Sequence, residues 1–313
     1  MVLESIAIFI IASLVLVKSA SYAVRSISSL ARYLHFSAFF AAFVLAGFIS
    51  TFPELFIGIN AALLGEPLVG VGTIIGTNIA DLTIALGIIV LVGRKISVDK
   101  VTMRNNLYFV VVTSLPVLLM IDGALTTDDG ILLVVVSLLY IWSILRREKI
   151  FGKDTKKNGR AIGVSLATFV LASVLLFVSA HYMVESGVAL AGIFGVPLVL
   201  VGLIVLALGS ILPELTFSLR AVLAKHKEIA LGDLLGNVAI DSTFSIGIVA
   251  LIAPIRSELA ILAVSALFMI LAALVVGTLL VAGRRLTWQE SFLLFYLYAM
   301  FLIVELLMRG IVG

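Results

Sequence analysis

Two stretches of the chain repeat one pattern, FISTFPELFIGINAALLGEPLVGVGTIIGTNIADLTIALG at 48–87 and GSILPELTFSLRAVLAKHKEIALGDLLGNVAIDSTFSIG at 209–247. Laid on each other without a gap, at an offset of 160, residues 50–91 and 210–251 match at 13 of 42 positions. A composition this apolar gives roughly four or five matches by chance. The matches fall on proline, glycine and acidic residues as well as on aliphatic ones, so the chain contains an internal repeat.

The composition around the repeat is that of a membrane protein. Of 313 residues, 62% are hydrophobic and 12% charged, and the mean hydropathy is +1.28. A soluble domain carries about a quarter of its residues as charges. We therefore expect an all-α membrane protein with ten transmembrane helices, since ten apolar runs are each long enough to span a bilayer. They lie near 3–22, 37–62, 68–92, 106–121, 130–146, 162–184, 194–222, 229–252, 259–281 and 290–308.

The basic residues predict the orientation of these runs. Nineteen of the 21 Lys and Arg residues fall in the odd-numbered connections or in the run ends that adjoin them, and only Arg256 and Arg309 fall elsewhere. Because basic loops stay in the cytoplasm, the odd connections are predicted to be cytoplasmic and both termini extracellular. The expected location is the plasma membrane of the cell, crossed many times.

The offset also divides the chain into two halves. It maps the first run onto the sixth and the fifth onto the tenth, so residues 1–146 and 161–313 form two five-helix repeats joined by a basic cytoplasmic linker at 147–160. Five is odd, so the second repeat is inverted relative to the first. Inverted repeats with interrupted helices are typical of secondary transporters, whose substrate site lies near the bilayer midplane.

Four repeated acids are predicted to lie at that midplane. Asp81 and Asp241 are 11 residues from the nearer end of their runs, and Glu54 and Glu214 are eight, which is about 12 to 17 Å at 1.5 Å per residue. One such residue costs roughly 2.5 to 3.5 kcal/mol to insert. Four like charges there would have to bind cations or protons, which indicates a cation site.

Other oxygen ligands surround these acids in the sequence. Pro53 has no N–H for the carbonyl of Ile49, and Pro213 has none for Gly209, so each helix is predicted to break one turn before its glutamate and to leave a backbone oxygen free. Such a mixed set of oxygens suits Ca²⁺ better than Mg²⁺, which requires a tight octahedron. Hydroxyl ligands are expected from Ser50, Thr51, Ser210 and Thr77.

The two stretches resemble the paired alpha repeats of the sodium/calcium exchanger, or calcium/cation antiporter, superfamily. There the pattern is G-T-S-x-P-E followed by G-N-x-x-G-S-N-x-x-N/D. The resemblance implies a secondary active antiporter, not an enzyme, that exchanges Ca²⁺ for Na⁺ by alternating access. Glu54 and Glu214 would be its central ligands, with Asp81 and Asp241 flanking them. Its partners would be membrane lipid and the transported cations, with no cofactor, nucleic acid or obligate protein partner.

Departures from the family pattern bear on the coupling ion. Aspartate at both 81 and 241 also suits a Ca²⁺/H⁺ antiporter or a K⁺-dependent Na⁺/Ca²⁺ exchanger, and these remain alternatives. In the second repeat Ile211 and Asn237 replace serines and Val238 replaces an asparagine, so hydroxyl ligands are lost on one side only. Asp233 stands where the first repeat has Thr73 and shares a helix face with Asn237 and Asp241. Additional candidate ligands are therefore Asp233, Asn237 and Asn78.

Two other classes of protein fit the residues less well. An intramembrane aspartyl protease is disfavoured because Gly232-Asp233 lacks the full G-x-G-D motif. A channel with four buried carboxylates would bind its ion too tightly to conduct. Elsewhere, His181 and Glu185 predict a hydrogen bond at a helix end, and Glu305 and Arg309 an ion pair along one helix.

Overall fold

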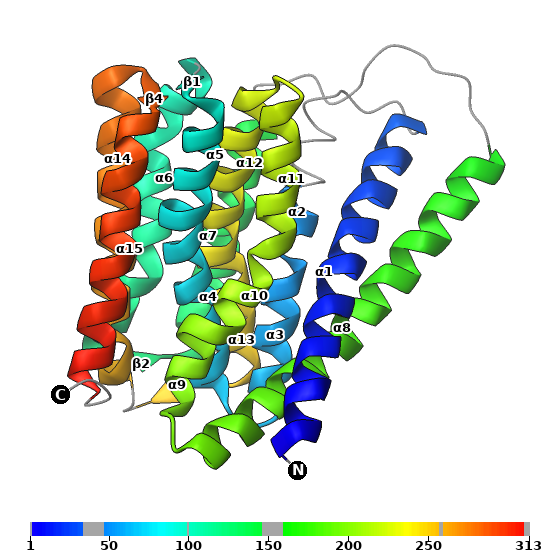
Figure 1. The fold of residues 1–313 in the computed structure, drawn as a ribbon, viewed down its shortest axis with the longest axis vertical. Helices are drawn as coiled ribbons and strands as arrows, with labels where there is room; N and C mark the ends of the chain where they lie inside the picture. The colour runs from blue at the N-terminus through cyan, green and yellow to red at the C-terminus, as the bar shows by residue number, and fades with distance from the viewer. Residues whose placement is uncertain (1, 34–46, 99, 146–158, 257–258, 310–313) are drawn as a thin grey trace.

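The fold is a bundle of helices in a computed structural model that describes residues 2–33, 47–98, 100–145, 159–256 and 259–309 (Figure 1). The first half contains α1 (Val2–Tyr33), α2 (Gly47–Ser50), α3 (Phe52–Leu63), α4 (Pro67–Ala80), the π-helical turn η2 (Asp81–Ala85), α5 (Leu86–Gly93), α6 (Lys100–Leu119), the 3₁₀ turn η3 (Met120–Asp122) and α7 (Thr127–Leu145). The second half contains α8 (Gly159–Phe194), α9 (Leu198–Leu200), the π-helical turn η4 (Val201–Leu206), α10 (Ala207–Ser210), α11 (Leu212–Leu223), α12 (Lys227–Ile240), the π-helical turn η5 (Asp241–Ser245), α13 (Ile246–Ile252), the 3₁₀ turn η6 (Leu259–Leu262), α14 (Ala263–Gly283) and α15 (Trp288–Met308).

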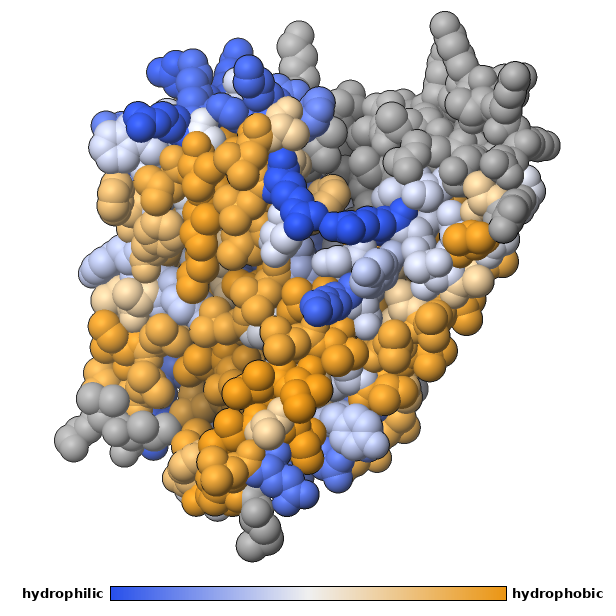
Figure 2. Space-filling view, turned by 45° about the vertical axis from the view of Figure 1, so that its right-hand side comes forward, coloured by the Kyte–Doolittle hydropathy of each residue, from blue (hydrophilic) through white to orange (hydrophobic). Residues whose placement is uncertain are grey.

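The helices present the apolar surface that a bilayer requires. Within the described residues, seven helical stretches are long and apolar enough to cross a membrane, and Phe52–Leu63 and Asn106–Asp122 are shorter apolar helices. Figure 2 shows a broad apolar surface, with many hydrophilic residues at its upper end and others across its middle and at its lower edge. The chain is therefore a multi-pass helical membrane protein. The predicted run 37–62 lies partly outside the described residues, and the count of ten spans stays a prediction. The seven stretches are Val2–Leu30, Pro67–Gly93, Ala161–Phe194, Leu198–Leu223, Ala230–Ile252, Ala263–Gly283 and Trp288–Met308.

Burial separates a central group of helices from a peripheral pair. In the stretch Pro67–Gly93, which contains α4, η2 and α5, 83% of the most apolar window is buried inside the protein, against 11% in Ala161–Phe194 of α8. The long helices α1 and α8 pack chiefly on each other and lean away from the bundle, and α8 also packs on α3 (Figure 1). Helices α1 and α8 are therefore the least enclosed part of the described fold.

The central elements recur at the offset seen in the sequence. Helices α3 and α11 begin 160 residues apart, as do α4 and α12, and η2 and η5. Each of α3 and α11 is preceded by a break in the helix, at Thr51 (φ −74°, ψ −5°) and at Ile211 (φ −70°, ψ −13°). The predicted interruption before each glutamate is confirmed. It consists of a single turn residue, two positions before the proline, whose ψ is close to zero.

Two short sheets join loops at opposite ends of the bundle. Strand β1 (Lys95–Ser97) pairs antiparallel with β4 (Arg285–Thr287), with Ile96 opposite Leu286. Strand β2 (Ala124–Leu125) pairs antiparallel with β3 (Ile255–Arg256). Strands β1 and β4 lie at the upper end of Figure 1, and β2 lies at the lower end together with both labelled termini.

Close packing in the centre depends on glycine. A Cβ on Gly76 of α4 would overlap the carbonyl oxygen of Leu203 in η4, and a Cβ on Gly202 would lie 2.6 Å from the carbonyl oxygen of Val69. The backbones of α4 and η4 therefore nearly touch, as small residues on facing helices allow.

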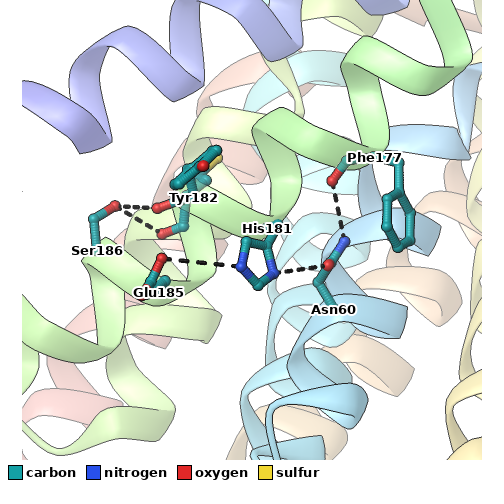
Figure 3. A network of polar contacts seen from close by, with 7 residues as sticks. Asn60, Phe177, His181, Tyr182, Glu185 and Ser186 are labelled. Carbon is teal, nitrogen blue, oxygen red and sulfur yellow. Dashed lines mark hydrogen bonds and ion pairs between the residues drawn. The ribbon is translucent and has the colours of Figure 1, made fainter.

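A polar network joins α8 to α3 (Figure 3). Asn60 Nδ2 donates to the carbonyl oxygens of Phe56 (2.8 Å) and Phe177 (3.2 Å), and Asn60 Oδ1 lies 3.2 Å from His181 Nδ1. His181 Nε2 lies 4.0 Å from Glu185 Oε2. The expected helix-end hydrogen bond of His181 is therefore wrong, because α8 continues to Phe194 and the ring bridges to another helix.

The predicted pairing of Glu305 and Arg309 is confirmed. Arg309 Nε donates to Glu305 Oε1 at 2.6 Å, and Arg309 Nη2 donates to the carbonyl oxygen of Ile261 at 2.7 Å. Ser265 of α14 donates to the other carboxylate oxygen, so this buried acid of α15 has partners.

Candidate ion-binding site

The four repeated acids occupy equivalent places on the central elements. Glu54 and Glu214 are the third residues of α3 and α11, and Asp81 and Asp241 are the first residues of η2 and η5. Each side chain is at most 1% exposed. All four are therefore enclosed within the protein, and their predicted depth near the bilayer midplane stays a prediction.

These acids form one electrostatic cluster although they lie far apart in the chain. Asp241 and Asp81 repel the charge of Glu54, and Glu54 and Asp81 repel the charge of Glu214. No Lys or Arg is among the fully buried residues of the described chain. The protein itself therefore places no buried basic side chain among them to balance their charge.

Most of the carboxylate oxygens also lack hydrogen bonds. In the described part of the chain, both oxygens of Glu54, Glu214 and Asp241, and Oδ1 of Asp81, have no hydrogen-bond partner. Asp81 Oδ2 accepts only a long bond, 3.5 Å, from Asn237 Nδ2. Unpaired buried acceptors are costly, so these oxygens suit a positively charged ligand.

Hydroxyl groups from both halves meet beside the acids. Thr77 Oγ1 of α4 lies 2.9 Å from Ser210 Oγ of α10. The Ser210 hydroxyl is close enough to Glu54 to stabilise its charge, but its hydrogen bonds go to Thr77 and to the carbonyl oxygen of Ala207. The structure thus brings together three predicted ligands, Thr77, Ser210 and Glu54.

The other predicted ligands take more varied positions. Ser50 and Thr51 are buried at the break before α3, where Thr51 donates to the carbonyl oxygen of Phe48 (2.8 Å). Ile49 lies in α2 and Gly209 in α10, each four residues before a proline. Asn78 Nδ2 donates to Ser242 Oγ at 3.2 Å, and its Oδ1 has no partner among the described residues.

The acids do not build a metal cage by themselves. Across the residues described, no three His, Cys, Asp or Glu side chains come close enough together to hold one metal ion. A cation bound here would have to complete its ligand shell with hydroxyl, amide, carbonyl or water oxygens. Ca²⁺ accepts such a mixed shell of 6 to 8 oxygens, whereas Mg²⁺ does not adapt to it readily.

Two π-helical turns at the site were not expected from the sequence. They begin at Asp81 and at Asp241, in the middle of otherwise regular helices, and such turns often occur at functional sites. Thr83 and Thr243 donate to the carbonyl oxygens of Ile79 and Ala239, four residues earlier. Thr83 and Thr243 are themselves a repeated pair at the offset of 160.

The chain is similar to known ion exchangers along nearly all of its length. The model of the family described as sodium/calcium exchanger protein matches residues 4–146 and 164–307. The putative antiporter CaxA of Alkalimonas amylolytica is 28% identical over 79% of this chain and 81% of its own length. The sodium/calcium exchanger MaX1 of Methanosarcina acetivorans is 22% identical over 97% of this chain and 99% of its own.

Solved structures share the fold. Structures of the sodium-calcium exchanger NCX_Mj align over 96% of this chain and 98% of theirs, with a TM-score of 0.71 and 20% sequence identity. At that identity the likeness concerns the arrangement of the helices.

Proposed function

Because this chain belongs to the sodium/calcium exchanger protein family, a family of antiporters, we propose that it exchanges Ca²⁺ for Na⁺ across the membrane by alternating access. One observation carries the proposal. Four buried acids from two repeated motifs repel one another, and no buried Lys or Arg in the described chain offsets their charge. The negative charge of such a cluster has to be balanced by bound cations. When one cation leaves, another must take its place to balance the charge.

The proposed architecture is ten transmembrane helices in two inverted five-helix repeats, residues 1–146 and 161–313. The linker proposed at 147–160 lies almost wholly outside the described residues. The sheets support the inversion. When residue numbers are shifted by 160, β1 coincides with β3, and β2 coincides with the start of β4. The repeat therefore relates the sheet β1–β4 to the sheet β3–β2. These two sheets lie at opposite ends of the bundle, as an inverted repeat requires.

In the proposed mechanism Ca²⁺ is the cargo, with Glu54 and Glu214 as central ligands and Asp81 and Asp241 beside them. The hydroxyls of Ser50, Thr51, Thr77 and Ser210 and the carbonyls of Ile49 and Gly209 would add oxygens, with Asn78, Asn237 and Asp233 as further candidates. Ca²⁺ and the coupling ion would compete for the same carboxylates, which makes transport an exchange.

Alternating access would come from movement of α1 and α8 against the central helices. Their burial supports this assignment, because only 17% of the apolar window of α1 and 11% of that of α8 are buried inside the protein. Helices that expose so much of their surface lose less packing when they move than the central helices would.

We place the protein in the plasma membrane with both termini outside, as the distribution of basic residues predicts. Its proposed partners are lipid and the transported cations. No cofactor, nucleic acid or obligate protein partner enters the proposal.

The coupling ion has two alternatives to Na⁺, a proton or Na⁺ together with K⁺. The name of the relative MaX1, a sodium/calcium exchanger, supports Na⁺. Aspartate at both 81 and 241 supports the alternatives.

The test is Ca²⁺ uptake into liposomes that contain the purified protein. A Na⁺ gradient and a pH gradient are imposed separately, each with and without K⁺, and protein-free liposomes serve as the control. Uptake driven by the Na⁺ gradient is the expected result. Uptake driven only by the pH gradient would replace Na⁺ with H⁺, and no uptake under any gradient would overturn the proposal.

A further inference from the structure

Helices α11 and α12 carry a carboxylate and a hydroxyl at two positions where the first repeat has other residues. Asp233 of α12 and Ser218 of α11 correspond, at the offset of 160, to Thr73 of α4 and Gly58 of α3. Both members of the pair therefore differ between the repeats at once, although the helices that carry them are equivalent.

Both polar groups are buried and unsatisfied. Asp233 is 4% exposed and Ser218 is fully buried. The Ser218 hydroxyl lies close enough to interact with the Asp233 carboxylate. In the described chain, however, neither oxygen of Asp233 nor Ser218 Oγ makes a hydrogen bond of normal geometry. Two unsatisfied oxygen-bearing groups therefore lie side by side inside the bundle.

The equivalent place in the first repeat is closed. Thr73 Oγ1 donates to the carbonyl oxygen of Val69 at 2.7 Å, so its hydroxyl is already satisfied. A Cβ on Gly58 would lie 2.7 Å from Val249 Cγ2, so a side chain there would have to displace Val249. The two sides of the central acids are therefore chemically different.

The pair lies between the central acids and one end of the molecule. Ser218 follows Glu214 by four residues and Asp233 precedes Asp241 by eight, which places them about 6 and 12 Å along their helices toward the α11–α12 connection. That connection lies beside β1, because Lys227 Nζ donates to the carbonyl oxygens of Gly93 (2.7 Å) and Lys95 (3.1 Å).

Charge couples the pair to the central acids. The carboxylate of Asp233 repels both Glu214 and Asp81. The ammonium group of Lys227 is held by backbone carbonyls at the rim, as described above. A cation at Asp233 would therefore relieve repulsion in the cluster as a whole.

We propose that Asp233 and Ser218 form a second cation site, on the path between the central acids and the end that carries β1 and β4. The inference rests on the proposed function. One carboxylate and one hydroxyl supply too few ligands for a dry Ca²⁺ or Na⁺, so the ion keeps several waters. A site of this kind holds an ion favourably enough to attract it and weakly enough to pass it on. The second site would therefore make cation entry from the β1–β4 face differ from cation entry at the opposite face.

The test restores the residues of the first repeat. Asp233→Thr alone, and Asp233→Thr with Ser218→Gly, are compared with the wild type in right-side-out and inverted membrane vesicles. The KM for Ca²⁺ and the half-saturating Na⁺ concentration are measured at each face. Removing one nearby negative charge is expected to raise the KM for Ca²⁺ about tenfold at the β1–β4 face and less than about twofold at the other face.

A matched control and a second variant keep the outcomes separate. Asp128→Asn removes one exposed negative charge near the opposite end, and we expect no change at either face. Asp233→Asn serves if Asp233→Thr does not elute as a monodisperse species. Equal increases at both faces, or no increase at either, would overturn the inference while leaving the exchanger function intact. Absence of transport by the wild type would overturn the proposed function instead.

Discussion

At the scale of single residues, the glutamates that open α3 and α11 are the strongest candidates for ion ligands. We expect Glu54→Gln and Glu214→Gln each to abolish Ca²⁺ uptake, because an amide keeps the shape but loses the charge that a hard divalent cation requires. Glu228→Gln, which changes an exposed glutamate of α12, is the matched control and should transport normally. Wild-type rates in either buried variant would refute the assignment.

Gly76 is a residue whose importance is steric. We expect Gly76→Ala to destabilise the protein by about 1 to 3 kcal/mol, because the new Cβ would overlap the carbonyl oxygen of Leu203, and a backbone atom cannot rotate away. The measurement is the apparent Tm of the purified protein in detergent. Gly163→Ala in α8 should leave the Tm nearly unchanged, since no described atom lies within 4 Å of its Cβ position. Equal Tm values for both variants would contradict the expectation.

Duplication made the central residues predictable from the sequence. Glu54 and Glu214 form one pair at the offset of 160, and Asp81 and Asp241 form another, so the sequence alone singles out all four. Asn60 has no such signal. It lies in an apolar helix and its partner His181 is 121 residues away, so only the folded chain reveals the contact.

At the scale of helices, Asn60 of α3 makes polar contacts with Phe177 and His181 of α8. We expect Asn60→Ala to lower the stability by about 1 to 3 kcal/mol, because it leaves the Phe177 carbonyl and the His181 ring without their partner. Thermal unfolding in detergent measures the change. The control is Thr278→Ala, an exposed residue of α14 whose hydroxyl bonds within its own helix, to the carbonyl oxygen of Leu274. A loss no larger than in the control would mean that these contacts carry no net stability.

Some features of the helices could be read from the sequence and others could not. The breaks before α3 and α11 follow from the missing N–H groups of Pro53 and Pro213, so they were predictable. The π-helical turns at Asp81 and Asp241 change the hydrogen-bond register without changing hydropathy, so periodicity does not detect them. Helices α1 and α8 extend beyond the runs predicted from the sequence, to Tyr33 and to Phe194.

At the scale of the whole molecule, the orientation in the membrane can be tested with cysteine, which the sequence lacks. Arg285→Cys lies on β4 and Asp128→Cys near β2, both at exposed positions. A thiol reagent that does not cross membranes should label Asp128→Cys in intact cells and Arg285→Cys only after the membrane is opened. The unmodified protein is the unlabelled control. The reverse pattern would invert the proposed orientation, and labelling of both variants in intact cells would contradict the spans.

The lengths of α1 and α8 have a consequence for the lipid around them. The apolar stretch of α8, 34 residues, measures about 51 Å, whereas that of α15, 21 residues, measures about 32 Å and matches a hydrocarbon core of about 30 Å. The longer helix fits only by tilting, and Figure 1 shows it tilted. We expect the transport rate to depend on the acyl-chain length of the vesicles, because a thicker bilayer draws this helix upright while the bundle stays matched. A rate that is independent of chain length would contradict this. If the rate does depend on chain length, the thickness of the membrane regulates the ion flux through this protein by changing the tilt of α8.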